Sequence, residues 1–204
     1  MTDTITRLRT SNTAKCVLAL AAAAVLLAVF AQAAPGSGFF FPLVSLWCNL
    51  ALFACVLLVL RVAGVKFDLF HKAVIVGLWA AALLYFFWAL DRRSFVYIWD
   101  YFNYINKQYS AEAAFLQGPA AGFQYIFGSF AEDYTNFITL FLDFPFCLSD
   151  RTGDSFAFCQ VFSILPMLLV LLAGLTIKVG QMLQVKNRFW YFLMGFSWCI
   201  TFPF

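Results

Sequence analysis

The chain has 204 residues, of which 64% are hydrophobic, 20% aromatic and only 11% charged. Soluble domains carry about a quarter charged residues, so this composition excludes a water-soluble globular protein. The formal net charge of +3 would by itself allow an acidic partner. The basic residues are instead distributed as markers of membrane topology, and we expect no nucleic-acid partner.

Uncharged apolar runs occupy most of the chain and are long enough to cross a bilayer, because about 20 apolar residues suffice for a helical span. A Pro-Gly-Ser-Gly segment at 35–38 divides the first run. The runs lack the alternation of barrel strands, so the sequence predicts an all-α polytopic membrane protein. Five transmembrane helices are expected near residues 16–34, 40–60, 73–90, 156–177 and 189–204.

The loops between these spans differ in charge. Nine of the thirteen basic residues lie before the first span, between the second and third, or between the fourth and fifth. The positive-inside rule makes that side cytoplasmic and predicts a cytoplasmic N-terminus, most simply in a bacterial plasma membrane. The opposite side receives the turn at 35–38 and a large extracytoplasmic loop at 91–154, where chemistry outside the membrane is expected.

The two terminal segments raise the questions of whether the first apolar run is cleaved and whether the protein is longer than this chain. Basic residues, an apolar run and the segment Ala31-Gln32-Ala33 also form the pattern of a cleaved secretory signal. Because the run is near spanning length, we expect residues 16–34 to be an uncleaved anchor. The last apolar run reaches Phe204 without a polar tail. We therefore expect residues 1–204 to be one membrane domain and the N-terminal part of a longer protein.

Residues 94–110 of the large loop show helical periodicity, with Trp99 and Phe102 on one face and Asp100 and Lys107 on another. Six of the eight tyrosines of the chain lie in the loop at 91–154, where rings with a polar tip suit the headgroup layer. The helical pattern and these tyrosines predict that 94–110 is an interfacial helix on the membrane surface. Aromatic rings also stack on sugars, so the same residues are compatible with a carbohydrate site.

The rest of the loop is apolar but unsuited to a straight span. Segment 113–131 contains Gly118-Pro119 and further glycines, which predict a bent or re-entrant helical pair against the outer leaflet. Segment 134–148 is too short to cross and is expected to lie in the interface.

The loop carboxylates are the candidate catalytic groups. Loop carboxylates are usually solvated, and Glu132-Asp133 before an apolar stretch also suits a helix N-terminus. Asp100 and Asp133 nevertheless lie in aromatic, membrane-facing sequence, where an unused charge is costly. Asp143 lies inside an apolar run, and we interpret it as a structural carboxylate at the headgroup boundary.

The order of these motifs resembles a known family. A Trp-Asp-Tyr-Phe-x-Tyr segment follows an outward-going span, a Glu-Asp-Tyr segment follows some thirty residues later, and then come an apolar helix, a polar turn with Arg151 and another span. Over roughly residues 73–177 this order resembles the amino-terminal part of bacterial GT-C-type glycosyltransferases of the dolichyl-phosphate-mannose mannosyltransferase kind. The chain departs from the family in having two spans before the one that introduces the loop.

The resemblance implies transfer of a sugar from a polyprenyl-phosphate donor to a hydroxyl of a glycan, lipid or protein acceptor. Such a transfer needs a carboxylate base and cations that neutralise the leaving phosphate. A divalent ion on Glu132 or Asp133 is compatible with this chemistry, although two carboxylates alone are a weak metal signature. The predicted catalytic residues are Asp100, Asp133 and Glu132, and the predicted substrate-binding residues are Arg151, Lys107, Tyr101, Tyr104 and Tyr134.

Two other classes of protein remain open on the sequence. A transporter would place charged residues within its spans, and the predicted spans contain no Asp, Glu, Lys or Arg. A non-catalytic multi-pass scaffold accounts for the composition equally well, and leaves the loop carboxylates unexplained.

Overall fold

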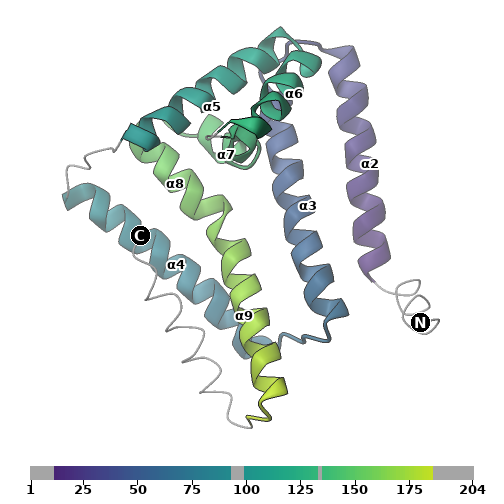
Figure 1. Cartoon of the computed structure of the whole chain (residues 1–204), viewed down its shortest axis with the longest axis vertical. Coiled ribbons are helices and arrows are strands. Elements are labelled where there is room, and N and C mark those ends of the chain that lie inside the picture. The colour runs from purple at the N-terminus through teal and green to yellow at the C-terminus, as the bar shows by residue number, and fades with distance from the viewer. Residues whose placement is uncertain (1–11, 93–98, 133–134, 186–204) are drawn as a thin grey trace.

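The computed structural model describes residues 12–92, 99–132 and 135–185, and every regular element in these ranges is a helix. Long apolar helices run side by side, and shorter helices lie across one end of them (Figure 1). The long helices are α2 (Asn12–Ala33), α3 (Phe40–Val62), α4 (Leu69–Arg92) and the consecutive pair α8 (Gly153–Ser163) and α9 (Leu165–Met182). The shorter ones are α5 (Trp99–Gln117), α6 (Pro119–Gly128), η1 (Ser129–Ala131), η2 (Asn136–Ile138) and α7 (Thr139–Cys147).

Four of the predicted spans are present as helices long and apolar enough to cross a membrane. The fourth is built from α8 and α9, which meet where Pro166 interrupts helical hydrogen bonding. The span predicted at 189–204 lies outside the described residues. The all-helical fold and these four helices are those of a multi-pass integral membrane protein.

The shorter helices α5, α6, η1, η2 and α7 form a unit that we call the cap. The interfacial helix predicted from residue 94 is seen as a helix from Trp99, and it continues to Gln117. The chain then breaks at Gly118, whose φ of 138° favours glycine, and Pro119 begins α6. The predicted break between two helices is therefore confirmed, and α5 packs along α6. Their position against the outer leaflet stays a prediction.

Two polar side chains of α3 hold α7 in place. Pro145 has no N–H, so the carbonyl of Phe141, four residues earlier, lacks its usual helical donor. Asn49 Nδ2 donates to that carbonyl at 2.8 Å, and Ser45 Oγ accepts from the N–H of Phe144 at 3.0 Å. A neighbouring helix thus satisfies the backbone group that proline leaves free, as apolar surroundings require.

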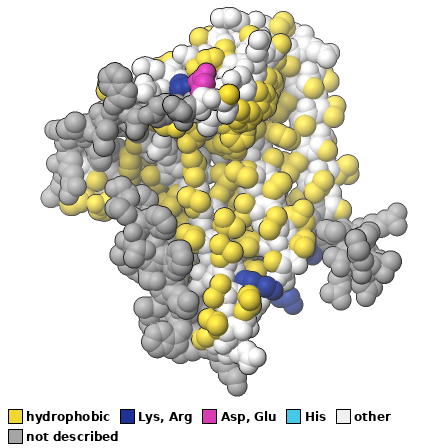
Figure 2. Space-filling view, viewed as in Figure 1, with side chains coloured by type: hydrophobic (Ala, Val, Ile, Leu, Met, Phe, Trp, Pro, Cys, Tyr) yellow, Lys and Arg dark blue, Asp and Glu magenta, His cyan; other side chains and the backbone are white. Residues whose placement is uncertain are grey.

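The core of the described residues has three clusters, of which two involve the cap and the third joins α3 to α9 around Leu60 and Val170. One cluster of buried residues joins Phe41 of α3 to Phe115 of α5, whose rings stack at 4.2 Å. A second cluster joins α5, α7 and α8 around Phe146 and Phe156. The spanning helices are much less buried, and Figure 2 shows apolar side chains along their visible face, with charged side chains near the two ends.

Candidate functional site

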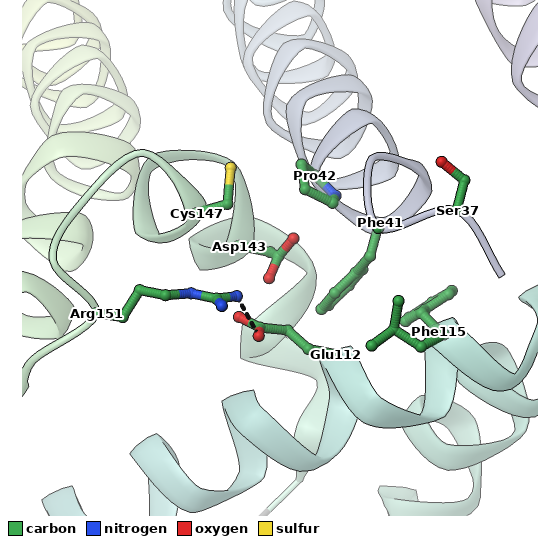
Figure 3. A pocket seen from close by; sticks show the side chains of 10 residues that line it. Ser37, Phe41, Pro42, Glu112, Phe115, Asp143, Cys147 and Arg151 are labelled. Carbon is green, nitrogen blue, oxygen red and sulfur yellow. Dashed lines mark hydrogen bonds and ion pairs between the residues drawn. The ribbon is translucent and has the colours of Figure 1, made fainter.

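Four polar side chains meet where α5, α7 and the turn after α7 come together. Gln108 and Glu112 lie four residues apart on α5 and therefore share a face of that helix. Asp143 comes from α7 and Arg151 from the turn that leads to α8. Figure 3 shows Glu112, Asp143 and Arg151 converging beside a small cavity.

Asp143 is the central group of this cluster. Its side chain is fully buried, and its Oδ1 accepts a hydrogen bond from Gln108 Nε2 at 2.7 Å. The Glu112 carboxyl lies within hydrogen-bonding reach of the Asp143 carboxyl. Glu112 also accepts a hydrogen bond from Arg151 Nη2, so the arginine and the carboxyl pair form one connected group.

Two buried oxygens of the carboxyl pair, Asp143 Oδ2 and Glu112 Oε1, have no hydrogen-bond partner among the described residues. A single proton held between the two carboxyls would supply the missing donor. Burial, and then the charge and hydrogen bond of Glu112, raise the pKa of Asp143 to about 8, although Gln108 and Arg151 act in the opposite direction. The raised pKa favours the protonated form of Asp143 at neutral pH.

Arg151 is held in an unusual backbone conformation. Its φ of 62° lies in the left-handed region, which is uncommon for a residue with a side chain. The Tyr109 hydroxyl donates to the Arg151 carbonyl, and the guanidinium lies 5.9 Å from the centre of the Phe146 ring. These contacts keep a cation at the cavity, and strain of this kind is often found at functional sites.

The cavity has a volume of about 190 Å³. This is smaller than the roughly 300 Å³ at which sites for drug-sized ligands begin. It therefore suits a small polar group, such as a phosphate or a hydroxyl, better than a whole glycolipid. Its lining comes from the 35–38 turn, α3, α5, α7 and the turn after α7, with Ser37, Gly38, Phe41, Pro42, Glu112, Phe115, Leu116, Asp143, Cys147 and Arg151.

The predicted substrate residues are divided between two places. Arg151 lies in the cluster, whereas Lys107 bonds to Glu132 at 3.1 Å and to Asn136 at 2.8 Å elsewhere on the cap. Tyr104 packs against the buried core around Ile105. Glu132 thus has a cationic partner, and the part of the chain that the structure describes holds no group of three or more His, Cys, Asp or Glu suited to a metal ion.

The remaining sequence candidates cannot be placed in the site. Asp133 and Tyr134 fall outside the described residues, as do the side chains of Asp100 and Tyr101, whose backbone begins α5.

Gln108 and Glu112 were not among the residues predicted from the sequence, and Asp143 was interpreted as a structural carboxylate at the headgroup boundary. In the structure Asp143 is buried between α3 and α5, and its depth in the membrane stays a prediction. The available signal was the four-residue spacing of Gln108 and Glu112 on one helical face. The spacing indicates a site only when it is known that α7 packs on α5 and brings Asp143 to the same face.

Fold and site together define a multi-pass helical membrane protein with two neighbouring carboxyls and an arginine at the capped end of its spans. No known protein family, curated protein or solved structure shows significant similarity to the chain.

Proposed function

We propose that this chain is a membrane glycosyltransferase that moves a sugar from a polyprenyl-phosphate donor to an acceptor hydroxyl on the extracytoplasmic side. The observation that carries the proposal is the pair of carboxyls of Asp143 and Glu112 beside Arg151, at a cavity of about 190 Å³. The motif order at 73–177, which resembles GT-C-type enzymes, supports the same reaction class. Paired carboxyls of unequal proton affinity are suited to acid and base roles.

Each group has a defined part in the proposed reaction. Arg151 leaves Glu112 and binds the donor phosphate, because a guanidinium binds phosphate oxygens through two parallel hydrogen bonds. The ionised Glu112 then accepts the proton of the acceptor hydroxyl. The hydroxyl oxygen bonds to the anomeric carbon, and the bond from that carbon to the phosphate oxygen breaks. The phosphate leaves with the electron pair, and its charge is neutralised by Arg151.

Asp143 is the positioning residue of this pair, since its proton and its bond to Gln108 hold it beside Glu112. Asp100 and Asp133 are the alternative bases that the sequence analysis favours, with Lys107 and the tyrosines at 101, 104 and 134 as further contacts to the sugar. The two assignments make different predictions for the same assay.

The test is turnover of a polyprenyl-phosphate-linked sugar by the full chain in proteoliposomes. Glu112→Gln should lower kcat by about a hundred- to ten-thousandfold, the usual contribution of a positioned proton transfer. Arg151→Gln should mainly raise KM. Asp154→Asn is the control, because it changes an exposed carboxylate at the start of α8, outside the carboxyl pair, and should leave the rate within about threefold.

Two results would contradict the proposal at different levels. A normal rate for Glu112→Gln together with an inactive Asp100→Asn or Asp133→Asn would move the base to the sequence-derived residues. Turnover indistinguishable from empty vesicles, across donors of different sugars, would favour the scaffold or transporter-subunit alternative.

A further inference from the structure

A second cavity lies at the other end of the molecule, between α2 and α3. It has a volume of about 350 Å³ and an almost wholly apolar lining. Small side chains of α3 create it, because Ala51, Ala54 and Cys55 face α2 where larger residues would fill the space. Cys16 and Leu20 of α2, one helical turn apart, form the opposite wall. We call this cavity the α2–α3 groove.

The groove is closed at the end nearer the cap. Trp47 of α3 donates from Nε1 to the carbonyl of Leu20 at 2.9 Å, which ties the two helices together there. Farther towards the cap, Phe30 and Phe40 stack with 6.4 Å between ring centres. Among the described residues, the groove therefore opens sideways and towards the end of the helices opposite the cap.

The length of the groove matches one leaflet. From Ala51 to Arg61 the helix rises about 15 Å at 1.5 Å per residue. This is half of the roughly 30 Å hydrocarbon thickness of a bilayer. Arg61 lines the open end, and Lys15 lies on α2 beside the Cys16 wall. An apolar channel of leaflet depth thus ends at basic side chains where lipid headgroups lie.

We propose that the α2–α3 groove binds one acyl chain of an anionic phospholipid whose headgroup phosphate contacts Arg61. The apolar lining accommodates the chain, and the charge at the open end selects the headgroup. This inference is independent of the proposed transferase activity, because Trp47 and the Phe30–Phe40 pair lie between the groove and the cap that holds the Asp143 site.

The experiment uses the full chain in phosphatidylcholine vesicles that contain a trace of phospholipid with a photoreactive diazirine at the acyl terminus. Phosphatidylglycerol and phosphatidylcholine probes are compared, and adducts are mapped by mass spectrometry. The phosphatidylglycerol probe should label the α2 and α3 groove residues about five times more than the phosphatidylcholine probe. That factor corresponds to about 1 kcal/mol for one basic side chain near the headgroup.

Two substitutions test the two parts of the site. Arg61→Gln should reduce phosphatidylglycerol labelling to the phosphatidylcholine level, and Ala54→Trp, which fills the groove, should reduce labelling by both probes. Lys72→Gln is the matched charge control. Ala80→Trp on α4 is the matched size control, since Ala80 is exposed on another helix. Size-exclusion profiles establish that each variant is folded, and Arg61→Gln still tests the site if Ala54→Trp does not fold.

Equal labelling of wild-type protein by the two probes would overturn the proposal. So would an equal loss of labelling in Arg61→Gln and Lys72→Gln. Cross-linking of Cys16 in one copy to Cys55 in another by a short bis-maleimide would assign the groove to an interface between copies, and would also overturn it.

Discussion

The cap and the spanning helices differ in what surrounds their apolar side chains. In the cap, Phe115, Phe146 and Asp143 are fully buried in protein, and polar groups pair with one another. In the spans, Leu84 of α4 is 70% exposed and Val59 of α3 is 63% exposed. The spans place apolar side chains against lipid, whereas the cap surrounds its side chains with protein.

This difference indicates that specific side-chain contacts contribute more to stability in the cap than at lipid-facing positions of the spans. Lipid tails are as apolar as leucine, so there is little hydrophobic gain when one spanning helix packs on another. A side chain in the protein interior makes close contacts that a smaller residue loses entirely. Substitutions in the cap should therefore be costly, and most substitutions on lipid-facing positions of the spans should be mild.

The largest expected difference is between Phe146→Ala in the cap and Leu84→Ala in α4. Phe146 packs on Phe156 and Tyr109 with ring centres 5.8 Å away, so its truncation should lower the free energy of unfolding by about 3–5 kcal/mol. Leu84→Ala should change it by no more than about 0.5 kcal/mol. Denaturant unfolding in mixed micelles measures both, and similar losses would invalidate the comparison.

A smaller effect is expected where the two regions join. Asn49→Ala leaves the Phe141 carbonyl without a donor and should cost about 1–3 kcal/mol. In a Pro145→Ala background the restored N–H can bond to that carbonyl, so the cost of Asn49→Ala should fall below about 1 kcal/mol.

A double-mutant cycle measures this coupling between Asn49 and Pro145. Thr176→Val is the control within a span, since the Thr176 hydroxyl only adds a bond to a carbonyl of its own helix. Additive costs of Asn49→Ala and Pro145→Ala would show that the proline and the asparagine are not linked.

The last expected effect is a pH dependence of the free energy of unfolding, which is small for each pH unit and which Asp143 of the cap should cause. The pKa of Asp143 is raised from 3.8 to about 8, so the folded protein keeps a proton that the unfolded chain releases between these values. The stability due to this proton is fully present below about pH 4 and is lost as the pH rises towards 8. The slope is at most about 1.4 kcal/mol per pH unit.

Asp143→Asn removes this titration, so unfolding measured from pH 5 to 9 should depend less on pH in the variant than in the wild type. Lys107→Gln, which alters a charge of the cap away from the carboxyl pair, should leave the pH dependence of the wild type unchanged. Parallel curves for wild type and Asp143→Asn would contradict the shared-proton arrangement.

The sequence alone was sufficient for the membrane class, for four helices that span and for the break at Gly118-Pro119. These features follow from composition and local backbone chemistry. The length of an apolar run and the missing N–H of a proline have the same effect whatever the tertiary contacts of the segment. The same local reasoning could indicate that 134–148 is too short to cross, but not what it packs against.

Only the tertiary structure decided the site. Asp143 acquires its raised pKa because α7 buries it against α5 and α3, and that crossing depends on Asn49 and Ser45, nearly a hundred positions earlier in the chain. Glu112 was not a candidate on the sequence, because its partner Arg151 lies 39 positions away in the turn after α7. Burial and charge pairing depend on distances between segments remote in sequence, and a pattern read along one segment does not contain those distances.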